Sequence, residues 1–360
     1  MGFNCGFLGL PNVGKSTIFN ALSAAGAQVE SYPFCTTEAQ IGTVSVPDEQ
    51  LDGLAELFPD KEKVPTKIEF FDLAGLVEGA HSGEGLGNQF LAEVRGVDAL
   101  VHVVRCFSNA DVPLEGGELS PVDDIEVIET ELLLKDLETV QKKLDGLERA
   151  FGREEEKTKE VCRHVAEGLS EGVQIREMDL SEHEEEELKD MAPLTAKPVL
   201  YVANVDEESP PRCAEKVSRY AEERGAESLT INGELEAELR ELDLDHEEQL
   251  QYLKEWGLQE SALDRLIQAG YRLLDLVTFY TTDGPEVRAW TVAEGTDARE
   301  AAGKIHTDFQ QNFIQAEVVP VAEVLNLGSV KKARESGLAR ARGDEYEVED
   351  GDLIHFVTGK

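Results

Sequence analysis

Basic residues are scarce in this sequence. Lys and Arg number 34 against 74 Asp and Glu among 360 residues, which gives a formal net charge of −40. This deficit excludes a generally basic, nucleic-acid-coating surface. The acidic residues are spread along the chain instead of forming one tail, so we expect a solvated acidic surface. Its self-repulsion falls in molar salt, where the Debye length is about 3 Å, and we therefore predict a halophilic protein from a high-salt cytoplasm.

Cysteines and long apolar runs are also scarce. The cysteines are odd in number and form no CxxC pair, which favours neither a disulfide framework nor a zinc site. We predict that all of them are reduced thiols: Cys5, Cys35, Cys106, Cys162 and Cys213. No run of about 18 apolar residues is present, and the N-terminus lacks the basic stretch and cleavage site of a signal peptide. The sequence therefore predicts a soluble, cytoplasmic protein.

Four apolar runs predict the central fold. They lie at 3–10, 68–76, 98–107 and 198–206, and helical patterns separate them. Runs of this length and composition that alternate with helices are typical of buried parallel strands. We predict an α/β fold with a doubly wound sheet, formed by residues 1–122 and 192–277.

Two further segments differ in character from this sheet domain. Between 123 and 191 the chain is rich in Glu, Lys and Leu, and its apolar residues follow spacings of three and four. This pattern predicts an inserted α-helical hairpin of coiled-coil type, with a single long surface helix as the alternative. From 278 to 360, alternating strand patterns and the turn signals at 283–284 (DG) and 350–351 (DG) predict a small ubiquitin-like β-grasp domain.

The first apolar run leads into a complete GxxxxGKS motif at 9–16, and a helical pattern follows. In such a loop the backbone N–H groups and the helix N-terminus hold phosphate oxygens. Lys15 would reach the β- and γ-phosphates, and the Ser16 hydroxyl would bind Mg²⁺. A Gly-rich turn that binds nothing is the alternative. The predicted nucleotide-binding residues of the loop are Asn12, Val13, Gly14, Lys15, Ser16 and Thr17.

A second motif, DxxG, ends the run at 68–76. In switch NTPases its Asp holds a water on Mg²⁺ and its Gly N–H senses the γ-phosphate. Here these positions are Asp72 and Gly75, and Thr36 lies between the two motifs as the expected metal-sensing threonine. The predicted metal ligands are therefore Ser16, Thr36 and Asp72, and Gly75 joins Lys15 in the predicted catalytic set.

Base recognition is predicted at 204–207, where a GTPase carries NKxD and this chain reads NVDE. Val205 replaces the Lys that packs along the purine, and Glu207 replaces the Asp that accepts two hydrogen bonds from guanine. A displaced carboxylate leaves guanine donors unpaired, at about 1–3 kcal/mol each. We predict that ATP is preferred over GTP, with Asn204, Val205 and Glu207 in the nucleotide site.

These motifs resemble those of the YchF type of Obg-like ATPase, within the translation-factor-related P-loop GTPases. The resemblance extends over essentially the whole chain, at 9–17 (GLPNVGKST), 32–36 (YPFCT), 72–91 (DLAGLVEGAHSGEGLGNQFL), 102–107 (HVVRCF), 204–207 (NVDE) and 301–309 (AAGKIHTDF). It implies a G-domain that prefers ATP, a helical-hairpin insertion, a C-terminal TGS domain and association with ribosomes.

The sequence does not identify the group that positions the attacking water. The catalytic His proposed for the family is absent from residues 107–117. Leu76 stands where many GTPases hold a Gln, so we expect a low intrinsic rate of hydrolysis. His81 is the local candidate for placing water, with an exposed loop histidine as the alternative. The resemblance also implies a redox-sensitive thiol at Cys35, against a small hydrophobic side chain.

The predicted ligands and partners are ATP, Mg²⁺ and the ribosome or ribosomal RNA, with no membrane and a monomeric state. We expect K⁺ to activate hydrolysis, because the Asn12 amide can hold a cation beside the γ-phosphate. Bracing of the loop by Asn12 is the alternative. The C-terminal domain and the helical hairpin are the expected ribosome contacts, since positive charge gathers at Lys331, Lys332, Arg334, Arg340 and Arg342.

An ATP-hydrolysing switch is the leading interpretation of this set of motifs. A P-loop small-molecule kinase is the first alternative, but a kinase needs a lid of Arg residues and no Arg cluster follows the phosphate motifs. A GTP-dependent translation or assembly factor and a scaffold with a structural nucleotide are the others.

Overall fold

The computed structural model describes residues 3–24, 29–31, 40–73, 86–109, 119–147, 153–242, 246–255 and 260–359. The chain divides into two compact units, residues 1–44 with 69–270 and residues 45–68 with 271–360. Residues 45–68, which were predicted to lie in the sheet domain, group instead with the C-terminal part of the chain. In the described part, no helix is both long and apolar enough to cross a bilayer.

A seven-stranded sheet forms the centre of the first unit, in the order β2-β3-β5-β1-β6-β7-β8. Its strands are β1 Phe3–Leu8, β2 Val29–Ser31, β3 Gln40–Ser45, β5 Lys67–Asp72, β6 Ala99–Arg105, β7 Val199–Asn204 and β8 Glu227–Ile231. From β1 through β8 along this order the neighbours are parallel, whereas β2 and β3 are antiparallel. Every residue of β6 and β7 is buried, as expected for central strands covered on both faces.

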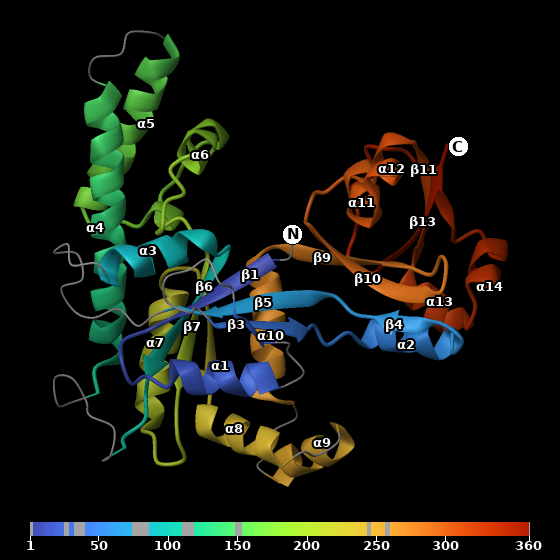
Figure 1. Ribbon diagram of the computed structural model, residues 1–360, viewed down its shortest axis with the longest axis horizontal. Helices are drawn as coiled ribbons and strands as arrows, with labels where there is room; N and C mark the ends of the chain where they lie inside the picture. The colour runs from blue at the N-terminus through green and yellow to red at the C-terminus, as the bar shows by residue number, and fades with distance from the viewer. Residues whose placement is uncertain are drawn as a thin grey trace. The chain divides into compact units, whose positions relative to one another are not determined.

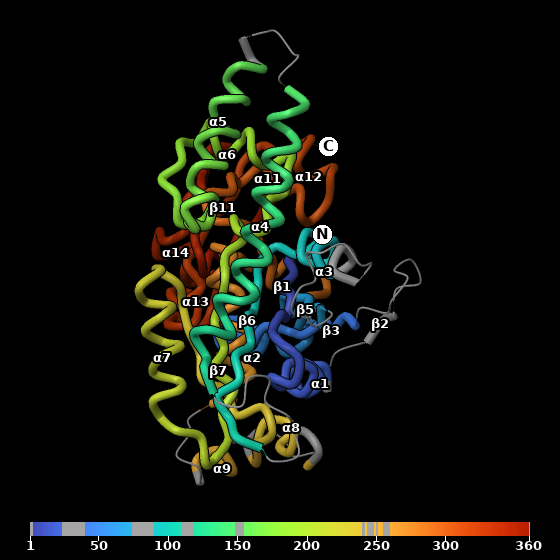
Figure 2. The backbone as a smooth tube through the Cα atoms, turned by 90° about the vertical axis from the view of Figure 1, so that its left-hand side faces the viewer, coloured from blue at the N-terminus to red at the C-terminus, as the bar shows by residue number. Residues whose placement is uncertain are grey.

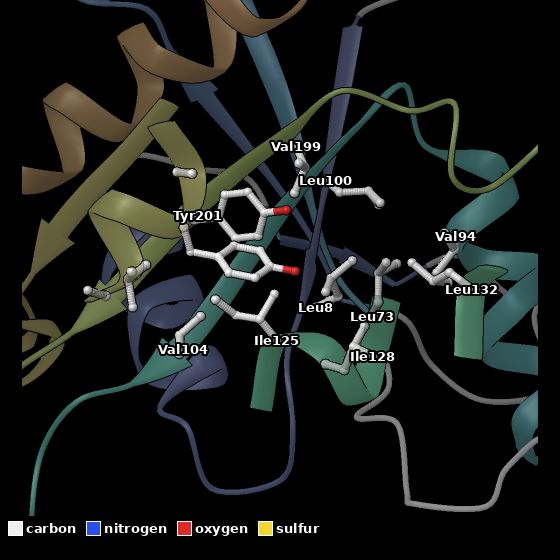
Figure 3. Close-up of a cluster of buried hydrophobic side chains, with 14 of the residues drawn as sticks. Leu8, Leu73, Val94, Leu100, Val104, Ile125, Ile128, Leu132, Val199 and Tyr201 are labelled. Carbon is white, nitrogen blue, oxygen red and sulfur yellow. The ribbon is translucent and has the colours of Figure 1, made fainter. Parts of the chain in front are cut away.

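Helices cover both faces of this sheet, so the doubly wound prediction is confirmed. The helices of this part of the unit are α1 Lys15–Ala24, α3 Leu86–Gly96, α4 Pro121–Leu147, α7 Pro211–Glu222, α8 Gly233–Glu241, α9 His246–Glu255 and α10 Ala262–Leu273. Figure 2 shows α1 on one side of the strands and α4 and α7 on the other. On the α4 side, Leu8, Leu100 and Tyr201 of the sheet meet Ile125 and Ile128 of α4 (Figure 3).

The long helix α4 continues beyond the sheet and packs against α5 Arg153–Ser170, beside which it lies in Figure 1. Val140 of α4 meets Val161, Val165 and Leu169 of α5 in a core of their own. A 3₁₀ turn, η2 Ile175–Glu177, and the helix α6 Glu182–Lys189 return the chain to β7. The predicted helical hairpin is thus confirmed; residues 148–152 between its two helices lie outside the described residues.

A buried carboxylate joins the base of the hairpin to the sheet. Glu129 of α4 accepts hydrogen bonds from the hydroxyls of Tyr201 and Tyr220, the latter at 2.7 Å. It also accepts from Gln174 Nε2 at 2.6 Å and pairs with Arg176 Nη2 at 2.9 Å. Burial raises the pKa of Glu129, but the Tyr201 hydroxyl, the Arg176 charge and the other donors outweigh it and lower that pKa. A buried charge with this many partners is the arrangement that a protein interior tolerates.

The second unit contains a six-stranded sheet in the order β12-β11-β13-β9-β10-β4. Its strands are β4 Glu62–Val64, β9 Leu276–Thr281, β10 Glu286–Ala293, β11 Phe313–Pro320, β12 Arg340–Arg342 and β13 Asp352–Thr358. Its helices are α2 Glu49–Leu57, α11 Ala298–Ile305, α12 Thr307–Gln311, α13 Val321–Leu327 and α14 Val330–Glu335. Strands packed on helices in this way agree with the predicted β-grasp fold.

Residues 45–68 join this second unit through one strand and one helix. The strand β4 pairs in parallel with β10 at the edge of the sheet. The helix α2 buries Leu51 and Leu54 among Tyr280, Val319 and other side chains of the unit. The residues that make these contacts are more than 200 positions apart in the sequence. A local sequence pattern therefore could not predict that they meet.

Candidate nucleotide-binding site

The loop between β1 and α1 has the backbone shape that a phosphate site requires. Gly9 packs so closely on the sheet that a Cβ there would lie 2.6 Å from the Val103 carbonyl oxygen. Asn12 and Gly14 have left-handed backbones, with φ of 62° and 87°. A Cβ at Gly14 would lie 2.2 Å from Asn204 Nδ2. Glycine is therefore required at 9 for space and at 14 for both space and conformation.

Lys15 and Ser16 meet Asp72 at the start of α1. Lys15 Nζ lies 3.2 Å from Asp72 Oδ1, and both side chains are largely buried. The Ser16 hydroxyl donates to Asp72 Oδ2 at 2.8 Å. The first turn of α1 carries no acidic residue, so its positive end and free N–H groups face no carboxylate of their own helix. The fold thus brings the GKS motif and the first residue of DxxG into direct contact.

The same residues fit a bound Mg²⁺. Asp72 Oδ1 is buried and accepts no hydrogen bond from the described residues, although Lys15 is close enough for an ion pair. A carboxylate and a hydroxyl side by side form the hard oxygen set that Mg²⁺ takes, completed by phosphate and water oxygens. Among the described residues, no group of three or more His, Cys, Asp and Glu forms a metal cluster. The donors therefore suit a metal shared with a nucleotide.

Asn204, at the end of β7, ties three segments together. Its Nδ2 donates to the Val13 carbonyl oxygen at 2.9 Å, and its Oδ1 accepts from the Gly233 N–H at 3.1 Å. The side chain is buried, so both halves of the amide are used inside the protein. Asn204 thereby holds the phosphate loop against β7 and the start of α8. Asn204 was predicted to lie in the nucleotide site, near the nucleobase, whereas Gly233 was not predicted as part of it. The only sequence signal for Gly233 is the 232–234 (NGE) segment.

The other three residues of the NVDE segment, Val205, Asp206 and Glu207, face different surroundings. Val205 is half-buried against the hydrophobic core, and its N–H donates to the Ile231 carbonyl oxygen at 2.9 Å. The Asp206 carboxylate accepts from Glu208 N–H and the Ser209 hydroxyl and so closes the turn. Glu207 is exposed. It lines a pocket of about 200 Å³ together with Asp206, Glu208, Asn232, Glu234, Leu235 and Glu238.

One prediction about the cysteines is wrong. Cys106 and Cys213 are joined in a disulfide, with their Cα atoms 5.5 Å apart. They are 107 residues apart in sequence, and only the parallel pairing of β6 with β7 and the return of the chain through α7 bring them together. Cys5 and Cys162 are free, as predicted, and both are buried. His102 and Cys106 are buried as well.

Several predicted site residues cannot be placed. Cys35, Thr36, Gly75, Leu76 and His81 lie outside the described residues, as does most of the loop after β6. Asn12 and Thr17 are exposed on the loop and on the first turn of α1. The structure therefore brings together Val13, Gly14, Lys15, Ser16, Asp72 and Asn204.

Two family models match the chain. A model of a 50S ribosome-binding GTPase matches residues 4–134, and the model of the YchF GTPase C-terminal domain, described as a protein of unknown function, matches residues 276–358. The first match covers the phosphate loop and the DxxG segment, and the second covers most of the second unit.

Relatives match over nearly the full length. The ribosome-binding ATPase YchF of Bacillus subtilis (strain 168) is 44% identical over 364 residues, covering 99% of each chain. Its counterpart in Escherichia coli O157:H7 is 43% identical over 363 residues, again covering 99% of each. Among solved structures, the YchF GTPase of Schizosaccharomyces pombe superposes with a TM-score of 0.87 at 34% identity, covering 99% of this chain and 98% of that one. A GTP-binding protein of Pyrococcus horikoshii OT3, at 18% identity and a TM-score of 0.59, shares the fold.

Proposed function

Since the chain belongs to the YchF family, we propose that it is a ribosome-associated ATPase that works as a nucleotide-dependent switch in the cytoplasm. One observation carries the proposal: Lys15 and Ser16 of the phosphate loop both contact Asp72 of the DxxG motif. This contact connects the residues that hold the phosphates with the segment that responds to them.

Binding of ATP exchanges the partners of Lys15. In the structure the Lys15 ammonium neutralises Asp72 at 3.2 Å. The β- and γ-phosphates would take over Lys15, while backbone N–H groups of the loop and α1 hold the remaining phosphate oxygens. Asp72 and Ser16 would then hold Mg²⁺, which neutralises phosphate charge when bound. The loss of the Lys15–Asp72 pair frees the segment after Asp72 to respond to the nucleotide.

The base preference follows from the segment after β7. Glu207 is exposed and one methylene longer than the Asp of NKxD, and Val205 is packed on the core instead of along a purine. These replacements remove the Lys that packs along the purine and the Asp that accepts two hydrogen bonds from guanine. Adenine would be held by backbone groups of the turn, and the family resemblance points the same way.

Calorimetric titration tests this preference. ATP or ADP should bind more tightly than GTP or GDP, and V205K/E207D should move the preference toward guanine. Equal or tighter binding of GDP than ADP by the unaltered protein would overturn the proposed selectivity and leave the phosphate site intact.

Turnover of ATP tests the function itself. Multiple-turnover hydrolysis should be slow alone and faster with ribosomes, since the intrinsic catalytic set is incomplete. Lys15→Ala should abolish both rates, whereas Lys216→Ala, an exposed lysine on α7, should leave them unchanged. Phosphoryl transfer to a small molecule instead of water would favour the kinase alternative. Tight binding without turnover would favour a scaffold.

The ribosome contact is proposed on the second unit, at the basic residues of α14 and β12. Lys331 is 84% exposed and paired only weakly, at 3.9 Å from Glu335, and Arg340 is exposed. Arg334 is held by Glu317 at 2.6 Å, and the Arg342 guanidinium stacks on Tyr346. K331E/K332E/R340E in the full chain should weaken co-sedimentation with ribosomes, and K216E should not. Unchanged sedimentation of the triple variant would point to the helical hairpin.

A further inference from the structure

The disulfide lies beside the nucleotide site. Cys106 follows β6 directly, and its N–H donates to the Asn204 carbonyl oxygen at 2.8 Å. Asn204 is the residue whose amide holds Val13 of the phosphate loop and Gly233. The cross-link is therefore one backbone hydrogen bond away from the side chain that shapes the loop.

The cross-link also encloses the turn that follows β7. Residues 205–210 run from Asn204 to the first turn of α7, where Cys213 lies. Cys106 is thus bonded to both ends of this turn, through its N–H to Asn204 and through its sulfur to Cys213. The turn includes Asp206, Glu207 and Glu208 of the pocket that adjoins the start of α8. Fixing both ends limits the conformations that the turn can adopt before nucleotide binds.

We propose that Cys106 and Cys213 form a reversible thiol–disulfide switch, closed by hydrogen peroxide and opened by a dithiol, that sets the affinity of the nucleotide site. This inference rests on the nucleotide site of the proposed function. In the disulfide form the turn is ordered in advance, so nucleotide binds more tightly. In the dithiol form that ordering accompanies binding and weakens it, by about threefold to tenfold.

The positions of the two sulfurs assign their roles. Cys106 is fully buried, whereas Cys213 retains 7% exposure, so we assign the attack on peroxide to Cys213. Cys213 lies in the first turn of a 12-residue helix that carries no acidic residue there. A helix N-terminus stabilises a thiolate, which is the nucleophilic form. Cys106 then acts as the resolving thiol.

The chemistry balances with peroxide as the oxidant. The Cys213 thiolate attacks one peroxide oxygen, the O–O bond breaks, and the departing hydroxide takes a proton to form water, leaving a sulfenic acid. The Cys106 sulfur loses its proton and attacks the Cys213 sulfur, so the S–S bond forms and the S–O bond breaks. The second hydroxide takes that proton as a second water. Two thiols lose two electrons, and one peroxide gains them; a dithiol returns them by thiol–disulfide exchange.

The other described cysteines are poor competitors. Burial, together with the nearby Asp98 charge, raises the pKa of Cys5 to about 12. Burial also raises the pKa of Cys162 in the helical hairpin. Both stay protonated at neutral pH, and a thiol is a far weaker nucleophile than a thiolate. Cys162 therefore offers a matched control.

The experiment compares the full-length protein after hydrogen peroxide and after dithiothreitol. Mass spectrometry of the non-reduced digest should show a Cys106–Cys213 cross-linked peptide after peroxide only. The Kd for ATP should be about threefold to tenfold lower in the oxidised form. Cys162→Ser should keep this difference, and Cys213→Ser and Cys106→Ser should each lose it and bind as the reduced protein does.

Three outcomes would overturn the inference. They are failure to find the cross-linked peptide, a cross-link without a change in Kd, and a redox effect that persists in Cys213→Ser and so belongs to another thiol. Loss of ATP binding in both redox states would instead contradict the proposed function. Because the cross-link is mapped by mass, the two failures are distinguishable.

Discussion

Asn204 shows how one side chain can organise a ligand site. Its amide uses its donor on Val13 and its acceptor on Gly233, while its backbone accepts from Cys106. Gly14 belongs to the same arrangement, because any Cβ there would collide with the Asn204 amide. The loop between β1 and α1 is thus held from the opposite side of the site as well as by its own sequence.

The first prediction concerns a substitution that removes the Asn204 side-chain amide. Asn204→Ala leaves the Val13 carbonyl and the Gly233 N–H without partners, a loss of about 1–3 kcal/mol. Because part of the loss falls on the shape of the phosphate loop, ATP should bind about tenfold more weakly. Titration calorimetry and urea unfolding measure the two effects. The control is Asn312→Ala, which removes an exposed hydrogen bond of a side-chain amide in the second unit. It should leave the Kd for ATP unchanged. Undiminished affinity in Asn204→Ala would mean that the loop holds its shape alone.

The second prediction concerns Asn12, whose backbone is left-handed and whose side chain is exposed. If its amide oxygen helps to hold K⁺ beside the γ-phosphate, ATP hydrolysis should be faster in KCl than in NaCl at matched ionic strength. Such a cation supplies charge where an arginine finger would. Asn12→Ala should remove the difference between the salts. Equal rates of the unaltered protein in both salts would show that Asn12 only braces the loop.

Among the secondary-structure elements, the strands agree best with what the sequence predicted. The apolar runs at 3–10, 68–76, 98–107 and 198–206 correspond to β1, β5, β6 and β7, with ends that differ by at most four residues. The alternating strand pattern predicted from 278 to 360 corresponds to β9, β10, β11 and β13. Burial explains this success, because a strand or helix covered on one or both faces must show an apolar pattern. Edge elements such as β4 bury little and gave no signal.

The third prediction concerns His102, in the middle of the buried strand β6. The ring of His102 lies 5.7 Å from that of Tyr201 and is fully buried, and this burial lowers its pKa from 6.5 to about 4 against the opposing charge of Glu129. Between these values the unfolded chain binds a proton and the folded chain does not. Stability therefore falls as the pH drops from 6.5 to 4, with His102 responsible for about 3 kcal/mol.

Denaturant unfolding across this pH range measures the effect. His102→Gln should have a flatter dependence of the free energy of unfolding on pH between 6.5 and 4. His183→Gln, an exposed histidine of α6, should keep the slope of the unaltered protein. Parallel curves for His102→Gln and the unaltered protein would show that folding does not lower the pKa of His102.

At the scale of the whole molecule, charge sets the conditions for stability. The net charge of −40 lies mostly on exposed Asp and Glu. Carboxylates repel one another over the Debye length, which is about 10 Å at 0.1 M salt and about 3 Å at 1 M. The folded state concentrates these charges more than the unfolded state does, so it gains more from screening.

The fourth prediction follows from this balance. The unfolding temperature should rise continuously as KCl increases from 0.1 M to 2 M, and most of the rise should come before 1 M, where screening is nearly complete. Sucrose of equal osmolality separates screening from general exclusion of the cosolute. An unfolding temperature that does not change with KCl would contradict the expectation of a high-salt protein.

The sequence by itself determined the features that are local. The phosphate loop, the DxxG segment, the NVDE replacement and the hairpin seam each lie within one stretch of chain, where spacing and residue type limit the conformation. The tertiary structure alone decided which distant residues meet: Asn204 with Val13, Glu129 with Tyr201 and Tyr220, and Cys106 with Cys213. It also decided that residues 45–68 belong to the C-terminal unit. These contacts depend on strand order and on loop closure over tens to hundreds of residues, and a local pattern carries no record of either.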